Sequence, residues 1–575
     1  MMIKKDTYKD KQMEQQEKIL LVMAPLWDRL IPPMGISCLK SYLQQHGYQV
    51  KTVDTNTVKV LHDSFDSYFE TLKNSLPRDK QGNFYNCIHH VIHDHMMAHL
   101  HQEDETEYVQ LVKIIICQTF LYSLEEIVLN GLNKIIAGYF NKLETYVLNL
   151  LENEKPTILG LSVYSSTLPS SLFTCKLARK VYPEIKTVVG GGIFTNQLAP
   201  GSPNLDFFCE KTRDYIDKII IGEGEILFVN YLKGKYPQSQ QVLTRQDLDG
   251  EVLDLSSIRK PDFSDFDLNY YIHLGAYGGR SCPLNCSFCS ETVIWGKYRK
   301  KSQQQVADEF MALYETHGTQ LFLMCDSLLN PLITNLSKEL LKRNIPVYWD
   351  GYLRADKQVC HTRNTLLWRR GGFYRARLGL ESGSQHILNL MDKKITPAQI
   401  IKAVSSLAYA GIKTTTYWLI GYPGETEEDF QQTLDLIEAL KDDIYEADCN
   451  PFDFFLTGQV GSEKWQGKES IRLYPEHARD MLVTETWYLS GEPSREETYQ
   501  RVSRFIRHCQ KLGIPNPYSM IDIHKADLRW KKLQQNAVPS LVDFEKSTGL
   551  IDECKIKNGS LPVKEMPQVE GDFAF

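Results

Sequence analysis

The chain has 575 residues, of which 42% are hydrophobic and 24% are charged. This length exceeds what one hydrophobic core serves, so we expect two to four domains of ordinary globular composition. The net charge is −7 and no long basic run occurs, which argues against nucleic acid as the main partner. The polar start lacks the apolar core of a signal peptide and no run of 18 apolar residues occurs, so we expect a cytoplasmic protein without a membrane span.

The first part of the chain alternates between strands and helices. A polar tail (1–17) precedes an apolar strand at 18–24, a helix that ends at Gly47 and a second strand. Strand patterns resume at 157–166, 187–194 and 218–225, with a helix after the first of them. Apolar strands that alternate with helices indicate a parallel, doubly wound sheet, which we assign to 18–235. Ligands bind such sheets at the carboxyl ends of the strands, where Gly190, Gly191, Gly192, Gly222 and Gly224 stand.

A helical insertion at 57–153 interrupts this rhythm. It holds seven of the fifteen histidines, six of them between His89 and His101. His89 and His93, or His95 and His99, lie one helical turn apart, a spacing that suits a metal ion. A solvated helix face is the reading we favour. We expect the insertion to cover the substrate entrance.

A second alternation follows a polar segment at 236–268, which reads as a linker. Two helices in it have clear start signals: Thr396 precedes Pro397 with Gln399 three residues on, and Thr426 precedes an acidic first turn. The pattern predicts six β/α units over 269–456, then a mixed C-terminal domain at 457–575. The expected strands lie at 271–277, 320–325, 346–351, 374–380, 413–420 and near 444–456.

Three cysteines stand within eight residues of the second alternation. Cys282, Cys286 and Cys289 have the spacing C-x3-C-x2-C, and the next cysteine is Cys325. A tetrahedral zinc site needs a fourth ligand. Three thiolates can instead hold three irons of a [4Fe–4S] cluster and leave the fourth iron open to a substrate or cofactor. Zinc or unrelated buried cysteines remain the alternatives at this point.

The cysteine spacing after the first strand of a β/α barrel resembles the radical S-adenosylmethionine (radical SAM) superfamily. Phe288, "YRKKS" (298–302), "GLESGSQHILNLMDKKIT" (379–396) and "LIGYPGETEEDF" (419–430) agree with it. The resemblance implies a radical SAM barrel whose reduced cluster cleaves SAM to a 5′-deoxyadenosyl radical, which abstracts hydrogen from a small-molecule or peptide substrate. It also implies an electron donor such as a flavodoxin or ferredoxin.

The resemblance assigns roles to individual residues. Cys282, Cys286 and Cys289 would bind the cluster, and Glu381, with Ser382 nearby, would face the polar groups of SAM. A turn carboxylate that caps the following residues is the alternative for Glu381. Asp326 stands where many relatives carry Gly-Gly-Glu and would contact the SAM amino group. The adenine side would be shaped by Gly421, Pro423, Gly424 and Glu425.

The first domain resembles the cobalamin-binding domain of the B12-dependent radical SAM class. The motifs are "PPMGISCLKSYLQQHGYQVKTVD", "GLSVYSST", "VVGGGIF" and "IIIGEGE". The histidine motif D-x-H-x-x-G of other B12 enzymes is absent. A domain that keeps the fold without the cofactor is the alternative. The resemblance implies that cobalamin lies on three loops, formed by Val163, Tyr164, Ser165, Ser166 and Thr167, by Gly190, Gly191 and Gly192, and by Gly222, Glu223, Gly224 and Glu225.

Three functions follow from these motifs. The first is cobalamin-dependent methylation of an unactivated carbon, or phosphorus, of a natural product or peptide. The second is cyclisation, rearrangement or peptide epimerisation without methyl transfer. Epimerisation needs a thiol that returns a hydrogen atom, for which Cys325 and Cys449 are candidates, although both also suit a core. The third is a non-catalytic cobalamin or iron–sulfur sensor.

Overall fold

The computed structural model describes residues 17–534 except 28, 82–83, 196–197, 457–458, 460–461, 466–467, 480–486 and 517–519. Apart from Glu17, the predicted tail 1–17 lies outside these residues, as does the end of the chain. Within the described part, no helix has both the length and the apolar character that a bilayer crossing demands.

The first sheet is parallel, and its six described strands have the order β2-β1-β3-β4-β5-β6. Chain order reverses between β1 and β3, so this is a doubly wound sheet with a switch point at that place. β6 was not predicted: it lies in the segment interpreted as a linker and extends the first sheet. The strands are β1 (Lys18–Met23), β2 (Gln49–Asp54), β3 (Ile158–Ser162), β4 (Lys186–Gly190), β5 (Lys218–Ile220) and β6 (Val242–Leu243).

Helices cover both faces of this sheet. On one face, α1 (Met34–Gln45) and α9 (Gly224–Leu232) share a core with the strands. On the other face lie α7 (Leu168–Val181), α8 (Pro203–Thr212) and the insertion. The insertion consists of α2 (Lys59–Ser75), α3 (Arg78–Gln81), α4 (Phe84–His101), α5 (Glu105–Phe120) and α6 (Glu126–Glu154).

The interpretation of the histidine-rich helix as a solvated face is wrong for α4. His93 is 5% exposed and His95 is fully buried. His95 bridges the hydroxyls of Tyr68 and Tyr108, each 2.9 Å from a ring nitrogen, and burial lowers its pKa to about 3. The helix is buried between the other insertion helices and α7, so these histidines are core residues.

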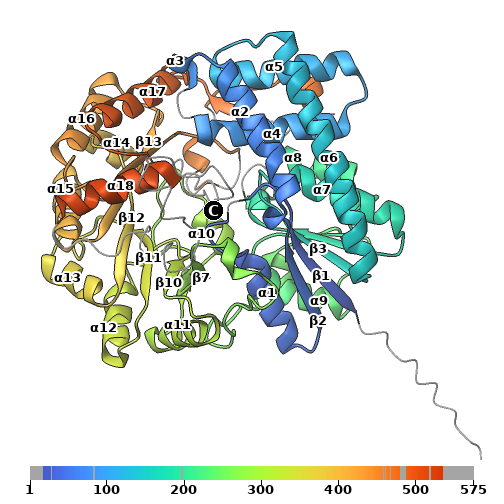
Figure 1. Cartoon of the computed structure of the whole chain (residues 1–575), viewed down its shortest axis with the longest axis horizontal. Coiled ribbons are helices and arrows are strands. Elements are labelled where there is room, and N and C mark those ends of the chain that lie inside the picture. Colours follow the sequence, from blue (N-terminus) through green and yellow to red (C-terminus); the bar gives the residue numbers. More distant parts are fainter. Residues whose placement is uncertain are drawn as a thin grey trace, which may run out of the picture.

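The second sheet is also parallel and forms a partial barrel, with its six described strands in the order β14-β13-β12-β11-β10-β7. This confirms the predicted α/β class and the six β/α units. The first sheet lies on the right and the barrel on the left in Figure 1, with α10 (Glu291–Trp295) between them. The barrel strands are β7 (Leu274–Ala276), β10 (Leu321–Met324), β11 (Tyr348–Leu353), β12 (Phe373–Glu381), β13 (Lys413–Ile420) and β14 (Glu446–Pro451).

The barrel helices begin where their sequence signals predict. Thr396 and Gln399 form a capping box at α15 (Pro397–Tyr409), and Thr426 and Asp429 form one at α16 (Glu427–Ala439). The remaining helices of the outer layer are α11 (Gln303–His317), α12 (Ile333–Arg343), α13 (Thr362–Arg370) and α14 (Gln385–Leu390). Short hairpins are formed by β8 (Gly279–Arg280) with β9 (Arg299–Lys300) and by β15 (Ser470–Arg472) with β16 (Trp487–Leu489).

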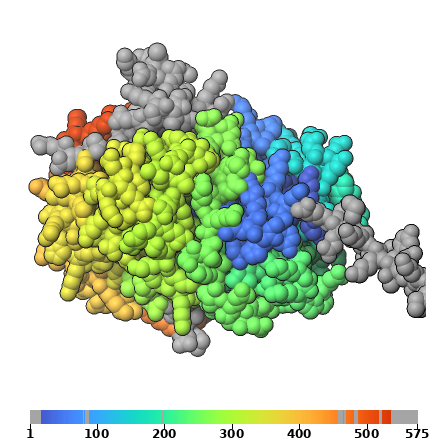
Figure 2. All heavy atoms as spheres, turned by 90° about the horizontal axis from the view of Figure 1, so that it is seen from below, coloured from blue at the N-terminus to red at the C-terminus, as the bar shows by residue number. Residues whose placement is uncertain are grey.

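The C-terminal segment packs across both halves. Helix α17 (Arg495–Lys511) lies against β13 and β14, and α18 (Met520–Leu533) adds Trp530 to a buried cluster with Tyr445. Tyr474 joins the core of the insertion, where its hydroxyl donates to Asp94 at 2.7 Å. In the space-filling view, light-green atoms at the start of the barrel lie directly against the blue atoms of the first domain (Figure 2).

Candidate functional site

The cysteine loop connects β8 to α10 at the carboxyl end of β7. Cys286 is buried, whereas Cys282 and Cys289 are half-buried. Burial raises the pKa of Cys289 to about 12, so metal binding must displace a proton there. Arg354, at the end of β11, places Nη1 3.8 Å from Cys286 Sγ.

This loop fits an iron–sulfur cluster. All three thiols are free of disulfides. Two cations, Arg354 and Lys393, face the cysteines and offset the charge of thiolates. Among the described residues, no three His, Cys, Asp or Glu side chains converge as a mononuclear metal site. Cluster ligands bind different irons, so their sulfur atoms need not converge on one point.

The end of β12 carries a strained carboxylate beside the cysteine loop. Glu381 has φ +65° at a register shift between β12 and β13, in the left-handed region that non-glycine residues seldom adopt. Its Oε1 lies 2.7 Å from Lys393 Nζ, and Lys393 lies 5.5 Å from the centre of the Phe288 ring. Burial alone lowers the pKa of Lys393, but the Glu381 carboxylate raises it above its ordinary value. Glu381 and Lys393 thus form a paired charge next to the cluster loop.

Ser382 is fully buried and shapes the turn after β12. Its Oγ accepts the Ser384 N–H at 3.1 Å and lies 3.3 Å from Thr433 Oγ1. The capping alternative considered for Glu381 therefore describes Ser382, whereas Glu381 pairs with a cation.

The turn after β13 is built on two glycines with positive φ, Gly421 at +78° and Gly424 at +95°. Pro423 lies between them. Glu425 is 2% exposed, and burial raises the pKa of its carboxyl to about 7, although the Gly421 N–H and Arg501 oppose this shift. The predicted adenine-side residues thus form one compact turn.

A cavity of about 400 Å³ lies between the two sheets. Its first wall is the carboxyl edge of the first sheet, including Leu21 of β1 and Gly160 of β3 on either side of the switch point. Its second wall comes from the barrel and from the residues on both sides of the cysteine loop. The barrel side consists of Tyr277, Gly279, Arg280, Ser281, Glu291, Ile294, Trp295, Cys325, Asp326, Ser327 and Tyr352.

Glycines give the first wall its hollow shape. A Cβ at Gly35, Gly222 or Gly224 would meet no heavy atom nearer than 3.8 Å. Gly191 instead allows a close approach, because a Cβ there would lie 2.4 Å from the Val163 oxygen. A glycine-lined hollow at the switch point fits a large planar ligand such as a corrin. Of the predicted cobalamin loops, the cavity is lined by Tyr164, Gly190, Gly191, Gly192, Gly222, Glu223, Gly224 and Glu225.

The rest of the 163–167 loop supports the cavity rather than lining it. Val163 and Thr167 are buried, and Thr167 Oγ1 accepts the Tyr164 N–H at 2.9 Å. Ser166 Oγ donates to the Leu26 oxygen at 2.7 Å. Tyr164 stacks on Trp27 with ring centres 4.2 Å apart. The loop thus presents one aromatic side chain to the cavity.

Ion pairs join the two walls. Arg280 Nη1 lies 2.8 Å from Glu223 Oε1, and its Nη2 lies 2.5 Å from Glu225 Oε1. Arg299 Nη2 lies 2.8 Å from the same Glu223 oxygen. Burial alone raises the pKa of Glu225, but Arg280 lowers it below its ordinary value. Two residues predicted as cofactor contacts therefore also hold the domains together.

The two candidate thiols have different surroundings. Cys325 lines the cavity beside Asp326, and burial raises its pKa. Burial raises the pKa of Asp326 to about 7, and its Oδ2 accepts the Gly278 N–H at 2.8 Å. Cys449 is fully buried in the barrel core and is not among the cavity-lining residues. On β14 it packs in the same core as Phe505 and Cys509 of α17, so the structure places Cys449 away from the cavity.

Several site residues escaped the sequence analysis. Arg280 stands two positions before Cys282, and only its proximity to the motif signals it. Lys393 lies within the quoted "MDKKIT" stretch without an assigned role. Glu291 and Trp295 follow Cys289 on α10 and are signalled only by that proximity. Arg354 and Arg501 have no sequence signal, because the fold alone brings them to the site.

Comparison with known proteins agrees with this geometry. Residues 277–437 match the family model described as the radical SAM superfamily. The match covers the barrel part of the chain and not the first sheet. The matched region begins at Tyr277, directly after β7, and contains the cysteine loop, Glu381 and the 421–425 turn.

Relatives of this chain have several activities in their names. The anaerobic magnesium-protoporphyrin IX monomethyl ester cyclase of Rubrivivax gelatinosus is 27% identical over 48% of this chain and 53% of its own length. The cytidylyl-2-hydroxyethylphosphonate methyltransferase of Streptomyces wedmorensis is 24% identical over 55% of this chain and 67% of its own length. The chain thus spans about half the length of the cyclase.

A solved structure shares the fold over nearly the whole chain. It is the radical SAM methyltransferase TsrM of Kitasatospora setae with cobalamin and a [4Fe–4S] cluster bound. The TM-score is 0.57 with 15% identity, and the match covers 93% of this chain and 99% of that one. The likeness is one of fold: a doubly wound domain followed by a partial parallel-stranded barrel.

Proposed function

We propose that this chain is a cobalamin-dependent radical SAM enzyme that methylates an unactivated carbon of a small molecule or peptide. The observation that carries the proposal is the shared cavity: the glycine-lined edge of the first sheet and both flanks of the cysteine loop face the same space. The methyltransferase names among the relatives and the cofactors in the TsrM title support it.

Each group has a place in the chain. Cys282, Cys286 and Cys289 hold the cluster, with Arg354 and Lys393 to balance its charge. Glu381 and the 421–425 turn bind SAM. The hollow between β1 and β3 holds cobalamin. Bound in these places, the cluster and SAM supply hydrogen abstraction from an unactivated position, and cobalamin supplies methyl transfer.

The chain's own residues orient and shield the reaction. The Arg280 pairs with Glu223 and Glu225 hold the cavity walls together, and Trp295 and Tyr164 line it with apolar surface that limits water. Reduction of the cluster requires an electron donor, for which we propose a flavodoxin or ferredoxin in the cytoplasm.

Cyclisation or epimerisation without methyl transfer is the second candidate. Two observations favour it: a relative is named a cyclase, and Cys325 lines the cavity, where a thiol can return a hydrogen atom.

The test is an anaerobic preparation supplied with iron, sulfide and hydroxocobalamin, desalted and then incubated with SAM, a reductant and a panel of peptides and small molecules. We expect retained corrin absorbance, cluster absorbance, 5′-deoxyadenosine and a methylated product. Retention of the cluster with SAM cleavage but without corrin would favour the cyclase or epimerase. Absence of any SAM turnover would leave the sensor.

A further inference from the structure

Helix α17 lies directly against the turn that follows β13. A Cβ placed on Gly421 would lie 2.2 Å from Thr498 Oγ1, so only glycine allows this approach. Gly421 also has φ +78°, which disfavours any side chain. The C-terminal helix and the 421–425 turn are therefore one packed unit, although 76 residues separate Glu425 from Arg501.

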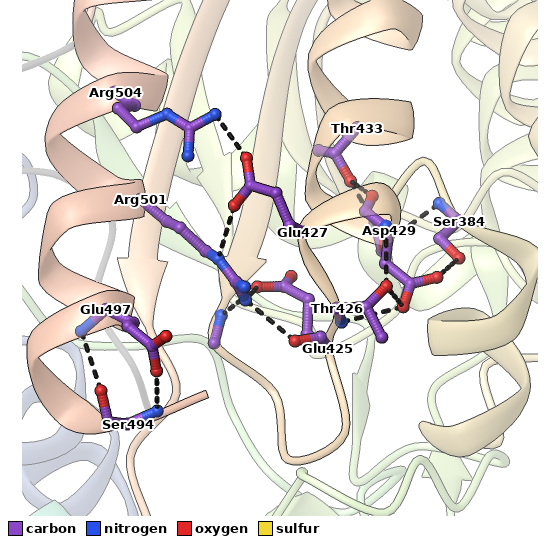
Figure 3. Close-up of polar contacts among 12 residues, drawn as sticks. Ser384, Glu425, Thr426, Glu427, Asp429, Thr433, Ser494, Glu497, Arg501 and Arg504 are labelled. Atoms are coloured by element: carbon purple, nitrogen blue, oxygen red, sulfur yellow. Dashed lines mark hydrogen bonds and ion pairs between the residues drawn. The ribbon is translucent and has the colours of Figure 1, made fainter. Parts of the chain in front are cut away.

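Arg501 holds this turn through its guanidinium group (Figure 3). Nη1 donates to the Glu425 main-chain oxygen at 2.9 Å and to its Oε2 at 3.0 Å. The same Oε2 accepts the Gly421 N–H at 3.0 Å. Arg501 thus fixes the end of the turn directly and its start through the Glu425 carboxylate. Arg501 is 7% exposed and Glu425 2% exposed, so water does not substitute for these contacts.

The other side of the turn is held by the barrel itself. Asp429 Oδ2 accepts the Thr426 N–H at 3.0 Å, and Asp429 Oδ1 accepts the Ser384 hydroxyl at 2.5 Å. These bonds tie the start of α16 to the residues that follow Glu381. The barrel thus anchors the turn beyond Glu425, where Arg501 Nε also lies 3.5 Å from the exposed Glu427 carboxylate, whereas Arg501 is the anchor of Gly421 and Glu425.

We propose that Arg501 is a positioning residue of the SAM site, which holds the 421–425 turn in the shape that accepts SAM. The proposal rests on the proposed function, since it assumes that this turn binds SAM. It makes α17 part of the SAM site, although the radical SAM family match ends at residue 437. A C-terminal helix outside the matched region thus determines how tightly SAM binds.

The test measures SAM binding to the cluster-loaded protein by equilibrium dialysis. Arg501→Gln is compared with Arg504→Gln, a matched change one turn further along α17, where Arg504 Nη2 lies 2.6 Å from Glu427 Oε1 in a pair that is 40% and 58% exposed. We expect R501Q to weaken SAM binding by about 10- to 100-fold, because a hydrogen-bonded buried charge loses its partner. R504Q should change it by less than about threefold.

Three further readouts separate positioning from general damage. Iron content should match wild type in R501Q, and the SAM KM should rise more than kcat falls. Hydrogen exchange at the Gly421 N–H, measured without SAM, should accelerate in R501Q and not in R504Q. If R501Q does not fold, Arg501→Lys replaces it. We expect R501K to bind SAM more weakly than wild type and R504Q do, without losing binding completely.

The outcomes distinguish the two proposals. Wild-type protein that loads the cluster but does not bind SAM would overturn the proposed function. Wild-type binding with an R501Q or R501K affinity equal to that of R504Q would overturn the role of Arg501 alone.

Discussion

Arg280 Nη1 lies 2.8 Å from Glu223 Oε1 and joins the barrel to the first sheet. Arg280→Gln leaves the buried carboxylate of Glu225 without this partner and leaves the partly buried Glu223 with Arg299 alone, so we expect a loss of about 3 kcal/mol in the free energy of unfolding. Urea unfolding of the anaerobic protein measures it. Lys113→Gln is the control, because Lys113 pairs with Glu126 in a pair that is 41% and 82% exposed, and should cost less than about 1 kcal/mol. Equal losses of unfolding free energy in the Arg280 variant and its control would contradict a structural role for the Arg280 pairs.

Alanine at Cys282, Cys286 or Cys289 should each remove the iron–sulfur cluster. With two thiolates left, we expect iron affinity to fall by more than about tenfold, since even changes around a metal site cost that much. Iron and sulfide analysis after reconstitution checks this. Cys117→Ser in the insertion should leave iron unchanged. A variant that kept full iron would show that its cysteine is not a ligand.

Gly35 tests the proposed cobalamin hollow. It lies in the first turn of α1, lines the cavity, and a Cβ there would meet only Ser162 Oγ at 3.8 Å. Gly35→Ala should therefore retain corrin as wild type does. Gly35→Phe fills the hollow and should weaken corrin retention by about 10- to 100-fold, with unchanged iron content. Corrin absorbance after desalting is the measurement, and full retention in G35F would place cobalamin elsewhere.

Cys325→Ala separates methylation from epimerisation. Methylation does not use this thiol, so 5′-deoxyadenosine formation and methylated product should stay within about twofold of wild type. Product analysis by mass spectrometry and chiral chromatography checks both. Loss of an epimerised product with continued SAM cleavage would instead support Cys325 as the donor of the hydrogen atom.

Asp429 should make a contribution to the free energy of unfolding that depends on pH. Burial alone raises its pKa, but hydrogen bonds from Ser384, Thr426 and His386 lower it to about 2. Its stabilisation is therefore present above the ordinary pKa of 3.8 and is lost as the pH falls through about 2. Asp429→Asn should cost about 2 kcal/mol at neutral pH and less in acid.

Unfolding curves between neutral pH and pH 2 test this. Asp435→Asn, a change at an exposed carboxylate on the same helix, is the control and should shift stability by less than about 0.5 kcal/mol. A D429N curve parallel to that of wild type at all pH values would contradict the assignment.

The sequence predicted what depends on neighbours along the chain. Both capping boxes, the parallel strands and the glycine turns have local causes, and the structure confirms them. The two-residue β6 was missed because it has no periodicity to detect. The buried histidines of α4 were predicted to be solvated because their burial comes from packing against other helices. The pair of Arg501 and Glu425 was missed for the same reason, since its partners lie far apart in the sequence.

The strand phase explains the two thiols. Cys325 follows the last residue of β10 and reaches the cavity, whereas Cys449 sits inside β14 on the side that packs against helices. Alternation along a strand identifies its two faces. It does not tell which face points into the barrel and which packs against the helices, because the inside of this barrel is also polar. The domain boundaries and the cofactor roles of the site residues stay predictions.

The insertion shares one continuous hydrophobic core with the first sheet, and that core reaches Tyr474 and Ala478 of the C-terminal segment. Because the core is shared, the insertion cannot be exchanged as a separate unit: its removal would expose apolar side chains of β1 and β3 to water. Point changes at the exposed ends of its helices would leave this core intact. Engineering of substrate choice should likewise target helix termini and connecting loops, and leave the interior of the insertion intact.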